Sequence, residues 1–579
     1  MDIVTYEILR SSLFATAREM KLAMMRTAGS PIVHSGGDAS AAVFDAEMQL
    51  VAQGNDIPTM LGSAVISTRA SVEAIGRDRL RPGDVIVSND VYLGGGNHQP
   101  DVQFTRPVFL DGEIIAFVMT RGHWSDIGGQ LPGSYTTLTW DVFAEGIRIP
   151  PVLLYRDDRP VEDLVTLILQ NTRDPAVRLL DMQAQYAGCV VGDRRITEIA
   201  RRYGKDALAA AMRRALDHSE RLMRAALRAI PDGVYEAEDA IEPVTGPAGW
   251  SRDPVPIRVK ITKQGDGIHF DYAGSGAQAR GGINCPFSVT CNSTWFTVKA
   301  ITDVTIPINQ GCYRPVTISA PEGSILNCTF PAPVVAGNTE TSPRIIDLLL
   351  KALSAAVPER VVGQSNCGAF SGVFGGMDPD AARVAATGRR FVGMIDPHAG
   401  GMGARATKDG VNGVRVYVGN AGSSAVEIIE QTSPVRVEEW SLVPDTGGAG
   451  TWRGGLTSRR VYRVAYDEAT FTVCGERGIH PPLGQFGGAA GATFRCEVTR
   501  DGQVTQVPAK GGHEIVHAGD RVVLQPAGSG GYGNPRDRDR TRLRDDLLDG
   551  YVSAEALTRD YGLTAEDAAA MLAEAAAHG

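Results

Sequence analysis

The sequence predicts an α+β fold: a large, multilayer, β-rich protein with N-terminal helices, a mixed sheet and a short helical C-terminal tail. Apolar side chains recur at helical steps in residues 2–29, and residues 233–330 alternate as strands do. With 579 residues the chain is long enough for several domains. We expect an N-terminal α/β domain over 1–232, a β-rich domain with interspersed helices over 233–535, and a helical tail over 536–579.

The first part of the chain alternates between helices and strands. Residues 2–29 and 62–77 are predicted helices, separated by a glycine- and serine-rich break and a strand pair at 41–53. A short buried strand at 84–88 then leads into a loop, 89–100, that contains three consecutive glycines.

A hairpin follows this loop. Residues 102–110 and 113–120 have strand patterns, and Asp111-Gly112 between them is a strong signal for a two-residue turn. Residues 161–230 return to helical spacing.

The second half is predicted mostly as β-structure. A helix is expected at 342–356, and a glycine-rich β region then extends to Pro535. The alternating Arg and Asp residues of 536–544 indicate a solvated linker, followed by helices near 553–561 and 564–578.

Composition excludes several classes of protein. The net charge is -10 and no basic stripe occurs, so no nucleic-acid partner is expected. The chain has no run of 18 apolar residues and no signal-peptide pattern, which predicts no membrane span. The 8 cysteines include no C-x-x-C pair, and their sparseness is typical of a reducing compartment. We therefore expect a cytoplasmic protein.

The ends of the predicted hairpin carry a cluster of histidines and carboxylates. His98 and Asp101 precede its first strand, and His123 and Asp126 follow the second. Two imidazoles and two carboxylates suit Zn, Mn or Fe. The alternative is that His98 and His123 are ordinary loop histidines with satisfied hydrogen bonds.

Register arithmetic tests whether these residues meet. A two-residue turn at 111–112 places Pro100 opposite His123 and Asp101 opposite Gly122, so both segments reach one end of the hairpin. Regular side-chain alternation, however, sends Asp101 and His123 to opposite faces. A metal site therefore requires a bulge, which we expect near Pro100. Asp38 is a further candidate ligand; its alternative role is that of a turn or N-cap residue.

Several segments together resemble the hydantoinase B/oxoprolinase family, which includes the beta subunits of N-methylhydantoinase and caprolactamase and the alpha subunits of acetone-type carboxylases. The matching segments occur in order along nearly the whole chain: Asn89–Asp101, Gly122–Gly129, Glu145–Pro151, Gln170–Arg173, Pro307–Cys312, Pro331–Val334, Gly337–Asn338, Gly400–Arg405, Arg453–Gly455 and Gly528–Gly533.

The resemblance implies a divalent metal held by His98, Asp101 and His123, with Asp38 as the fourth ligand. Two positions depart from the family pattern. Gln99 stands where the family usually has Leu, and Met60 stands where it often has His. If that histidine contacts substrate, its replacement favours a different or more apolar ring substituent.

The resemblance also implies a reaction. A hydantoinase A-type ATPase subunit phosphorylates the carbonyl oxygen of a small cyclic amide, and this chain hydrolyses the activated ring, with a metal lowering the pKa of the attacking water. A heterotetramer or larger hetero-oligomer is expected. No G-x-x-x-x-G-K-[ST] motif occurs, so ATP would be used through the partner. Asp126 is a candidate general base, or it orients His123.

Two other functions remain open from the sequence. The first is a subunit of an ATP-dependent acetone- or acetophenone-type carboxylase, which joins an activated enol to activated bicarbonate. The second is a scaffold that only assembles the ATPase. A scaffold predicts no stoichiometric metal, and a carboxylase predicts dependence on bicarbonate.

Overall fold

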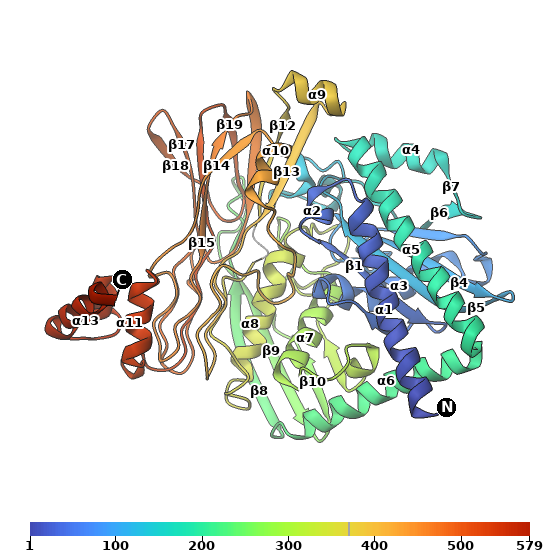
Figure 1. The fold of residues 1–579 in the computed structure, drawn as a ribbon, viewed down its shortest axis with the longest axis horizontal. Helices are drawn as coiled ribbons and strands as arrows, with labels where there is room; N and C mark the ends of the chain where they lie inside the picture. The colour runs from blue at the N-terminus through green and yellow to red at the C-terminus, as the bar shows by residue number, and fades with distance from the viewer. Residues whose placement is uncertain (369–370, 579) are drawn as a thin grey trace.

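A computed structural model describes residues 1–368 and 371–578. Four β-sheets form its framework, with helices packed on and between them (Figure 1). The predicted α+β class is confirmed. Among the helices within these residues, none has the length and apolarity to cross a membrane.

The first sheet has seven antiparallel strands in the order β2-β1-β5-β4-β3-β6-β7. Its strands are β1 (Ala39–Asp45), β2 (Leu50–Gln53), β3 (Val85–Ser88), β4 (Asp101–Leu110), β5 (Glu113–His123), β6 (Val152–Arg156) and β7 (Arg159–Pro160). Helices α1 (Ile3–Thr27) and α5 (Pro175–Tyr203) cover one face, and α3 (Pro58–Ile75) covers the other. Because both faces are covered, β1 to β3 are buried along their whole length.

Local sequence explains where these helices begin. The Asp2 carboxylate accepts a hydrogen bond from the Thr5 amide and caps α1. Pro58 occupies the first turn of α3, where its missing N–H leaves no bond unmade, so α3 begins four residues before the predicted start at residue 62. Further helices are α2 (Pro31–His34), α4 (Glu162–Gln170), α6 (Lys205–Arg228), α9 (Ala381–Thr387) and α10 (Val426–Thr432).

The second sheet has the order β11-β10-β9-β8 and is the mixed sheet, because β10 and β11 run parallel. Its strands are β8 (Gly233–Ile241), β9 (Val255–Gln264), β10 (Gly267–Asp271) and β11 (Val316–Ser319). Helices α7 (Phe287–Ile301) and α8 (Ser342–Ala352) share an apolar core with it. A π-helical turn, Gly337–Thr341, leads into α8.

Helix α7 corrects the prediction of continuous strand-like structure over 233–330. Its sequence is rich in Thr, Val and aromatic residues, which favour strands. In the folded chain the hydroxyls of Ser293, Thr294 and Thr297 each donate to the carbonyl four residues earlier. These bonds satisfy the hydroxyls inside the core, so the helix is buried on nearly every side.

The third and fourth sheets form a sandwich with one core. The third sheet consists of β13 (Phe391–Pro397), β12 (Ser371–Met377), β16 (Glu468–Cys474) and β19 (Gly512–His517). The fourth consists of β14 (Val435–Leu442), β15 (Ser458–Val464), β20 (Arg521–Gln525), β17 (Arg495–Arg500) and β18 (Gln503–Gln506). Phe374 and Phe471 from one sheet pack with Tyr462 and Leu524 from the other.

The C-terminal tail forms three helices, α11 (Arg540–Leu548), α12 (Ala554–Arg559) and α13 (Ala565–His578). They lie at the opposite end of the molecule from α1 and α5 (Figure 1). The prediction of a solvated stretch over 536–544 is confirmed for most of its side chains, which are exposed, but it is wrong for Arg538. Arg538 is buried and pairs with both Asp409 and Asp546, while Asp539 caps α11. The carboxylates of Asp409 and Asp546 balance the charge of this arginine and allow its burial, and the local sequence does not reveal that they come close to it.

The contact between α3 and α7 gives a first testable prediction. A Cβ at Gly62 would lie 1.8 Å from Asn292 Oδ1 and 2.9 Å from its Cβ, so Gly62→Ala forces these helices apart. We expect the free energy of unfolding to fall by about 1–3 kcal/mol, measured by urea denaturation. Gly267→Ala is the matched control, because its nearest neighbour would be 3.7 Å away. Equal stability of the two variants would contradict this packing.

Candidate metal centre

The register of the β4–β5 hairpin determines which side chains meet at its open end. The predicted turn at residues 111–112 is present, but a bulge lies between Val108 and Phe109 and leaves Ile115 as an extra residue on β5. The bulge therefore lies near the turn and not near Pro100, and it shifts every later pair by one residue.

This shift brings Asp101 and His123 together. They are direct partners across the two strands, so their side chains leave the same face of the sheet. The predicted pairing of Pro100 with His123, and of Asp101 with Gly122, is wrong by one residue. The predicted convergence of the two segments is correct, and its cause is the bulge at Ile115.

Asp38 continues this row onto the adjacent strand. Ala39 at the start of β1 pairs with Gly122, and the amide of His123 donates to the Asp38 carbonyl at 3.1 Å. Asp38, His123 and Asp101 therefore form one row across three neighbouring strands. Burial raises the pKa of the Asp38 carboxyl to about 6, although the positive charge of Arg415 opposes this shift.

The loop before β4 supplies His98. Gly95 has a φ of +62°, and a Cβ on Gly94 would lie 2.3 Å from Ser88 Oγ, so the predicted tight glycine loop is confirmed. The Asn89 side chain links the far end of this loop to a distant segment, because it donates to the carbonyl of Gln99 and to the carbonyl of Ile147. These contacts hold the loop against the end of the sheet.

A distant backbone carbonyl orients the His98 ring. Nδ1 lies 2.9 Å from the Val335 oxygen, which only accepts hydrogen bonds, so Nδ1 carries the proton. Nε2 then faces Asp101 Oδ1 at 3.2 Å, and in the neutral ring it is the nitrogen that can bind a metal. The ring centroids of His98 and His123 are 5.3 Å apart. Such a bond to the second nitrogen is typical of metal-ligating histidines.

Three of the sequence-predicted ligands fit a bound cation. His98 Nε2, Asp101 Oδ1 and His123 Nδ1 are buried and have no hydrogen-bond partner within the described residues. The ligand atoms of these three residues lie within 4.8 Å of one another. Buried polar atoms are almost always satisfied in folded proteins, and a divalent cation among them would satisfy all three. Asn97 donates to the other Asp101 oxygen at 2.9 Å and fixes the carboxylate.

The electrostatics keep His123 and Asp101 in their ligating forms. For His98, burial lowers the pKa, but the neighbouring Asp101 carboxylate more than offsets this and raises it, so a metal would bind there in place of a proton. Burial, and then the charge of His98, lowers the pKa of His123 to about 3, so its imidazole is neutral. Burial alone would raise the pKa of Asp101, but His98, His123 and Arg121 together lower it to about 2. Neutral imidazoles and an ionised carboxylate are the forms that bind metal.

The cluster opens into a cavity of about 40 Å³, which has room for about three water molecules. Its walls come from several parts of the chain: Ile32, Asp38, Ile57, Thr59, Met60, His98, Asp101, His123, Tyr135, Asn338, Thr339, Ser371, Ile395, Pro397, Arg415 and 418–421. The ligands lie within the first predicted domain, whereas much of the opposite wall comes from residues after 337.

A family model for hydantoinase B/oxoprolinase matches residues 2–535. The chain belongs to the hydantoinase B/oxoprolinase family. The caprolactamase beta subunit from Pseudomonas jessenii is 32% identical over 592 residues, covering 100% of this chain and 98% of the relative. The predicted family resemblance is confirmed.

Solved structures agree with this membership. The ATP-dependent caprolactamase from Pseudomonas jessenii matches with a TM-score of 0.90 and 30% identity, covering 100% of both chains. An acetone carboxylase matches with a TM-score of 0.86 and covers 99% of this chain and 82% of the other. At 20% identity, this second likeness shows a shared fold.

Asp126, the candidate base, does not line the cavity. Its Oδ1 accepts from the amides of Gly128 and Arg173, and its Oδ2 accepts from the Gly133 amide and from the Arg173 guanidinium at 2.8 Å. Both oxygens are thus occupied by the loop that follows β5 and by Arg173. The structure does not bring Asp126 to the other predicted site residues.

Sequence reasoning missed Arg121, which lies two residues before His123 on the same face of β5. It is buried and donates to the Met60 carbonyl and to the hydroxyls of Ser63 and Ser67. These bonds fix the first turns of α3 to the sheet, and they place Met60 in the cavity wall. Its alignment with His123 at a two-residue spacing was a usable signal.

Glu145 is a second missed residue, although it begins one of the motifs. Its Oε1 accepts from the amides of Val334 and Val335 at 2.8 and 2.9 Å. Burial raises the pKa of Glu145 to about 8, while these two backbone bonds oppose the shift. Glu145 thus positions the Val335 carbonyl that orients His98.

Proposed function

We propose that this chain is the metal-dependent hydrolytic subunit of an ATP-dependent enzyme that opens a small cyclic amide. The observation that carries the proposal is the convergence of three unsatisfied, buried ligand atoms on one small cavity. Family membership supports the class of reaction, because the relatives include subunits of a caprolactamase and of a D-/L-hydantoinase.

His98, Asp101 and His123 would hold the metal, with Asp38 as the fourth ligand. A divalent cation there lowers the pKa of a water and polarises a carbonyl or phosphoryl oxygen. The protein's own residues orient this site. Val335 holds His98, Asn97 holds Asp101, and the β-sheet holds His123.

The remaining cavity walls carry groups that an activated ring would contact once the cavity, which holds about three water molecules in this structure, widens to admit it. Ile57, Met60 and Val418 form apolar surface against which ring methylenes pack, and Met60 replaces the family's polar histidine. Arg415 also lines the cavity, and its guanidinium favours an anionic group such as a phosphorylated oxygen. We assign no proton transfer to Asp126, because its oxygens bind backbone amides and Arg173.

ATP would be used by a hydantoinase A-type partner subunit that phosphorylates the ring carbonyl oxygen. The absence of a P-loop motif from the sequence supports this division, as do the names of the caprolactamase and hydantoinase relatives, which are subunits. The partners would assemble as a heterotetramer or a larger hetero-oligomer. Zn, Mn and Fe all suit the N and O ligand set.

The test is turnover of a panel of lactams and hydantoins by the chain together with its ATPase partner. We expect ring-opened amino acids to form only with both subunits and ATP, without bicarbonate. Ring opening by this chain alone without ATP would refute the two-subunit proposal.

The carboxylase alternative makes the opposite prediction. The likeness to acetone carboxylase concerns the fold, and it motivates the control. Turnover of a ketone that depends on bicarbonate, with no ring opening, would establish the carboxylase activity in place of the hydrolase.

A further inference from the structure

Opening a cyclic amide requires a proton for the leaving nitrogen, and the metal cluster does not supply one. The carbon–nitrogen bond breaks with its electron pair going to nitrogen, and an alkyl amide anion is too basic to leave unprotonated. Among the described residues that line the cavity, Tyr135 carries a hydroxyl that can donate this proton.

A chain of hydroxyls connects Tyr135 to a buried acid. The Tyr135 hydroxyl donates to Thr339 Oγ1 at 2.5 Å, and Thr339 also lines the cavity. Since both groups are hydroxyls, the bond reverses when they rotate. Thr339 belongs to the π-helical turn Gly337–Thr341, a distortion that often marks functional sites. The next residue of that turn is Glu340.

Glu340 is a fully buried carboxyl group that can hold and donate a proton. Its exposed fraction is 0%, and neither side-chain oxygen makes a hydrogen bond of normal geometry within the described part of the chain, although the hydroxyl of the adjacent Thr339 acts on the carboxyl group. An ionised carboxylate in such a place is strongly disfavoured, so the group keeps its proton. Burial, and then the charge of Glu476, raises the pKa of Glu340 to about 8, against the lowering influence of Lys510, Arg415 and the Thr339 hydroxyl.

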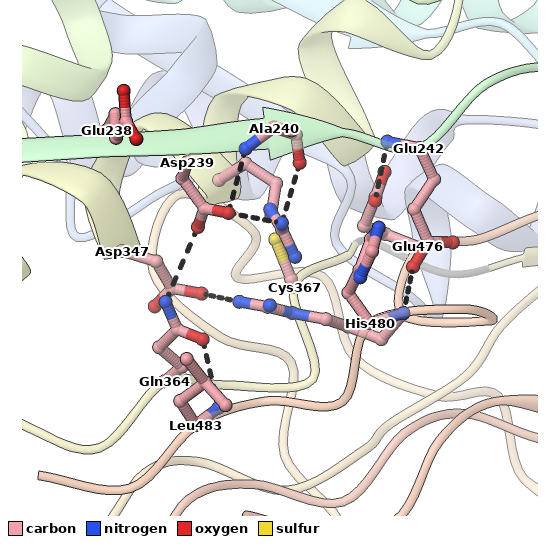
Figure 2. Close-up of polar contacts among 12 residues, drawn as sticks. Glu238, Asp239, Ala240, Glu242, Asp347, Gln364, Cys367, Glu476, His480 and Leu483 are labelled. Carbon is pink, nitrogen blue, oxygen red and sulfur yellow. Dashed lines mark hydrogen bonds and ion pairs between the residues drawn. The ribbon is translucent and has the colours of Figure 1, made fainter. Parts of the chain in front are cut away.

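The surroundings explain why no cation neutralises Glu340. Lys510, whose positive charge acts on Glu340, already pairs with Glu476 and donates to the Glu242 carbonyl. Glu476 also accepts from the Glu242 amide, and the Glu242 carboxylate accepts from the amides of 478–480 (Figure 2). Two of these three acidic groups are satisfied, and Glu340 is the one left protonated.

We infer that Tyr135 is the proton donor to the leaving nitrogen and that Glu340 resupplies it through the Thr339 hydroxyl. The Tyr135 Oη proton passes to nitrogen as the carbon–nitrogen bond breaks. Thr339 then gives its proton to the phenolate and receives one from Glu340. The proton released by the attacking water returns along the same hydroxyls in the opposite direction and restores Glu340. The ring-opened chain is then an acyl phosphate, which a second water hydrolyses to a carboxylate and free phosphate, so the turnover balances. Tyr135 would be a catalytic residue, and Glu340 would act only through it. This inference rests on the proposed ring opening.

The first test compares two leaving groups in the holoenzyme with its partner and ATP. Tyr135→Phe should slow opening of a simple lactam, whose leaving amine is strongly basic, by about 10²- to 10⁴-fold. A hydantoin releases a less basic urea nitrogen. The factor by which Tyr135→Phe slows its opening should therefore be at least ten times smaller than the factor for the lactam. Tyr155→Phe is the matched control. Tyr155 lies on β6 of the first sheet, stacks on Tyr186 of α5 and does not line the cavity. Metal content and melting temperature should stay at wild-type values in both variants.

Equal losses on both rings, or no loss on either, would overturn the inference while leaving the proposed function intact. If the wild-type enzyme opens neither ring, the proposed function fails and this inference fails with it.

The second test is the pH profile of Glu340→Gln. Glu340 is protonated below its raised pKa and loses its proton as the pH rises through about 8. The wild-type rate should therefore fall above that pH, and the variant should be slower and lack this limb. The groups that act on Glu340 and Tyr135 are Glu476, Lys510, Arg415, Cys474 and the Thr339 hydroxyl.

Thr339→Val interrupts the same path with little change of shape and keeps the test decisive if Glu340→Gln does not fold. It should reproduce the slow rate, again more strongly on the lactam. An unchanged alkaline limb in Glu340→Gln, or an unchanged rate in Thr339→Val, would contradict the relay.

Discussion

His98→Ala is expected to remove the metal and reduce ring opening by at least about 10³-fold. A catalytic metal contributes several kcal/mol to transition-state stabilisation, and each 1.4 kcal/mol corresponds to a factor of ten in rate. The variant removes one of three mutually facing ligands, so of that group only Asp101 and His123 remain beside the proposed fourth ligand, Asp38. Metal content by elemental analysis and kcat with the ATPase partner are the two measurements.

His513→Ala is the matched control for this variant. His513 lies on β19 with an exposed side chain, so the same substitution changes neither the cavity nor the core. Its metal content and rate should equal those of the wild-type protein. Full metal occupancy in His98→Ala would show that the cation binds elsewhere, and unchanged turnover would favour the scaffold alternative.

Arg477→Met is expected to lower the free energy of unfolding by about 3–5 kcal/mol. Arg477 and Asp347 form a buried ion pair at 2.6 Å, with both side chains 1% exposed. Removing the guanidinium leaves the Asp347 carboxylate buried without its charge partner, and this penalty exceeds the loss of packing. Tyr417, which also donates to Asp347, and the nearby charge of Arg344 then remain.

The pair joins α8 to the loop after β16, so its loss should loosen the second sheet from the sandwich. In Figure 2 a dashed line joins Asp347 to the guanidinium of this pair, and nearby Gln364 bonds Asp239 and Leu483. Arg463→Met is the control, because Arg463 pairs with Glu438 on the surface, where ion pairs contribute about 1 kcal/mol or less. Chemical denaturation of both variants measures the difference, and a loss below 1 kcal/mol in Arg477→Met would contradict it.

Short-range patterns were sufficient for the elements with strong local signals. The helix at α1, the turn between β4 and β5, and the buried strands around them follow from spacing and turn residues. Helix α7 and the ion-paired Arg538 were predicted wrongly for a common reason. Their environment is built by residues far away in the chain, and the burial that results outweighs local preference.

The sequence by itself determined the family and the set of candidate ligands, because Asp38, His98, Asp101 and His123 lie in recognisable motifs at the ends of adjacent strands. Only the tertiary structure decided how they meet. Ile115 shifts the hairpin register by one residue, and the Val335 carbonyl sets the tautomer of His98. The position of the bulge depends on which strand pairing packs better in the folded sheet. The Val335 carbonyl lies 237 positions away from His98 in the chain. Neither appears in a local pattern, and both are needed for a closed site.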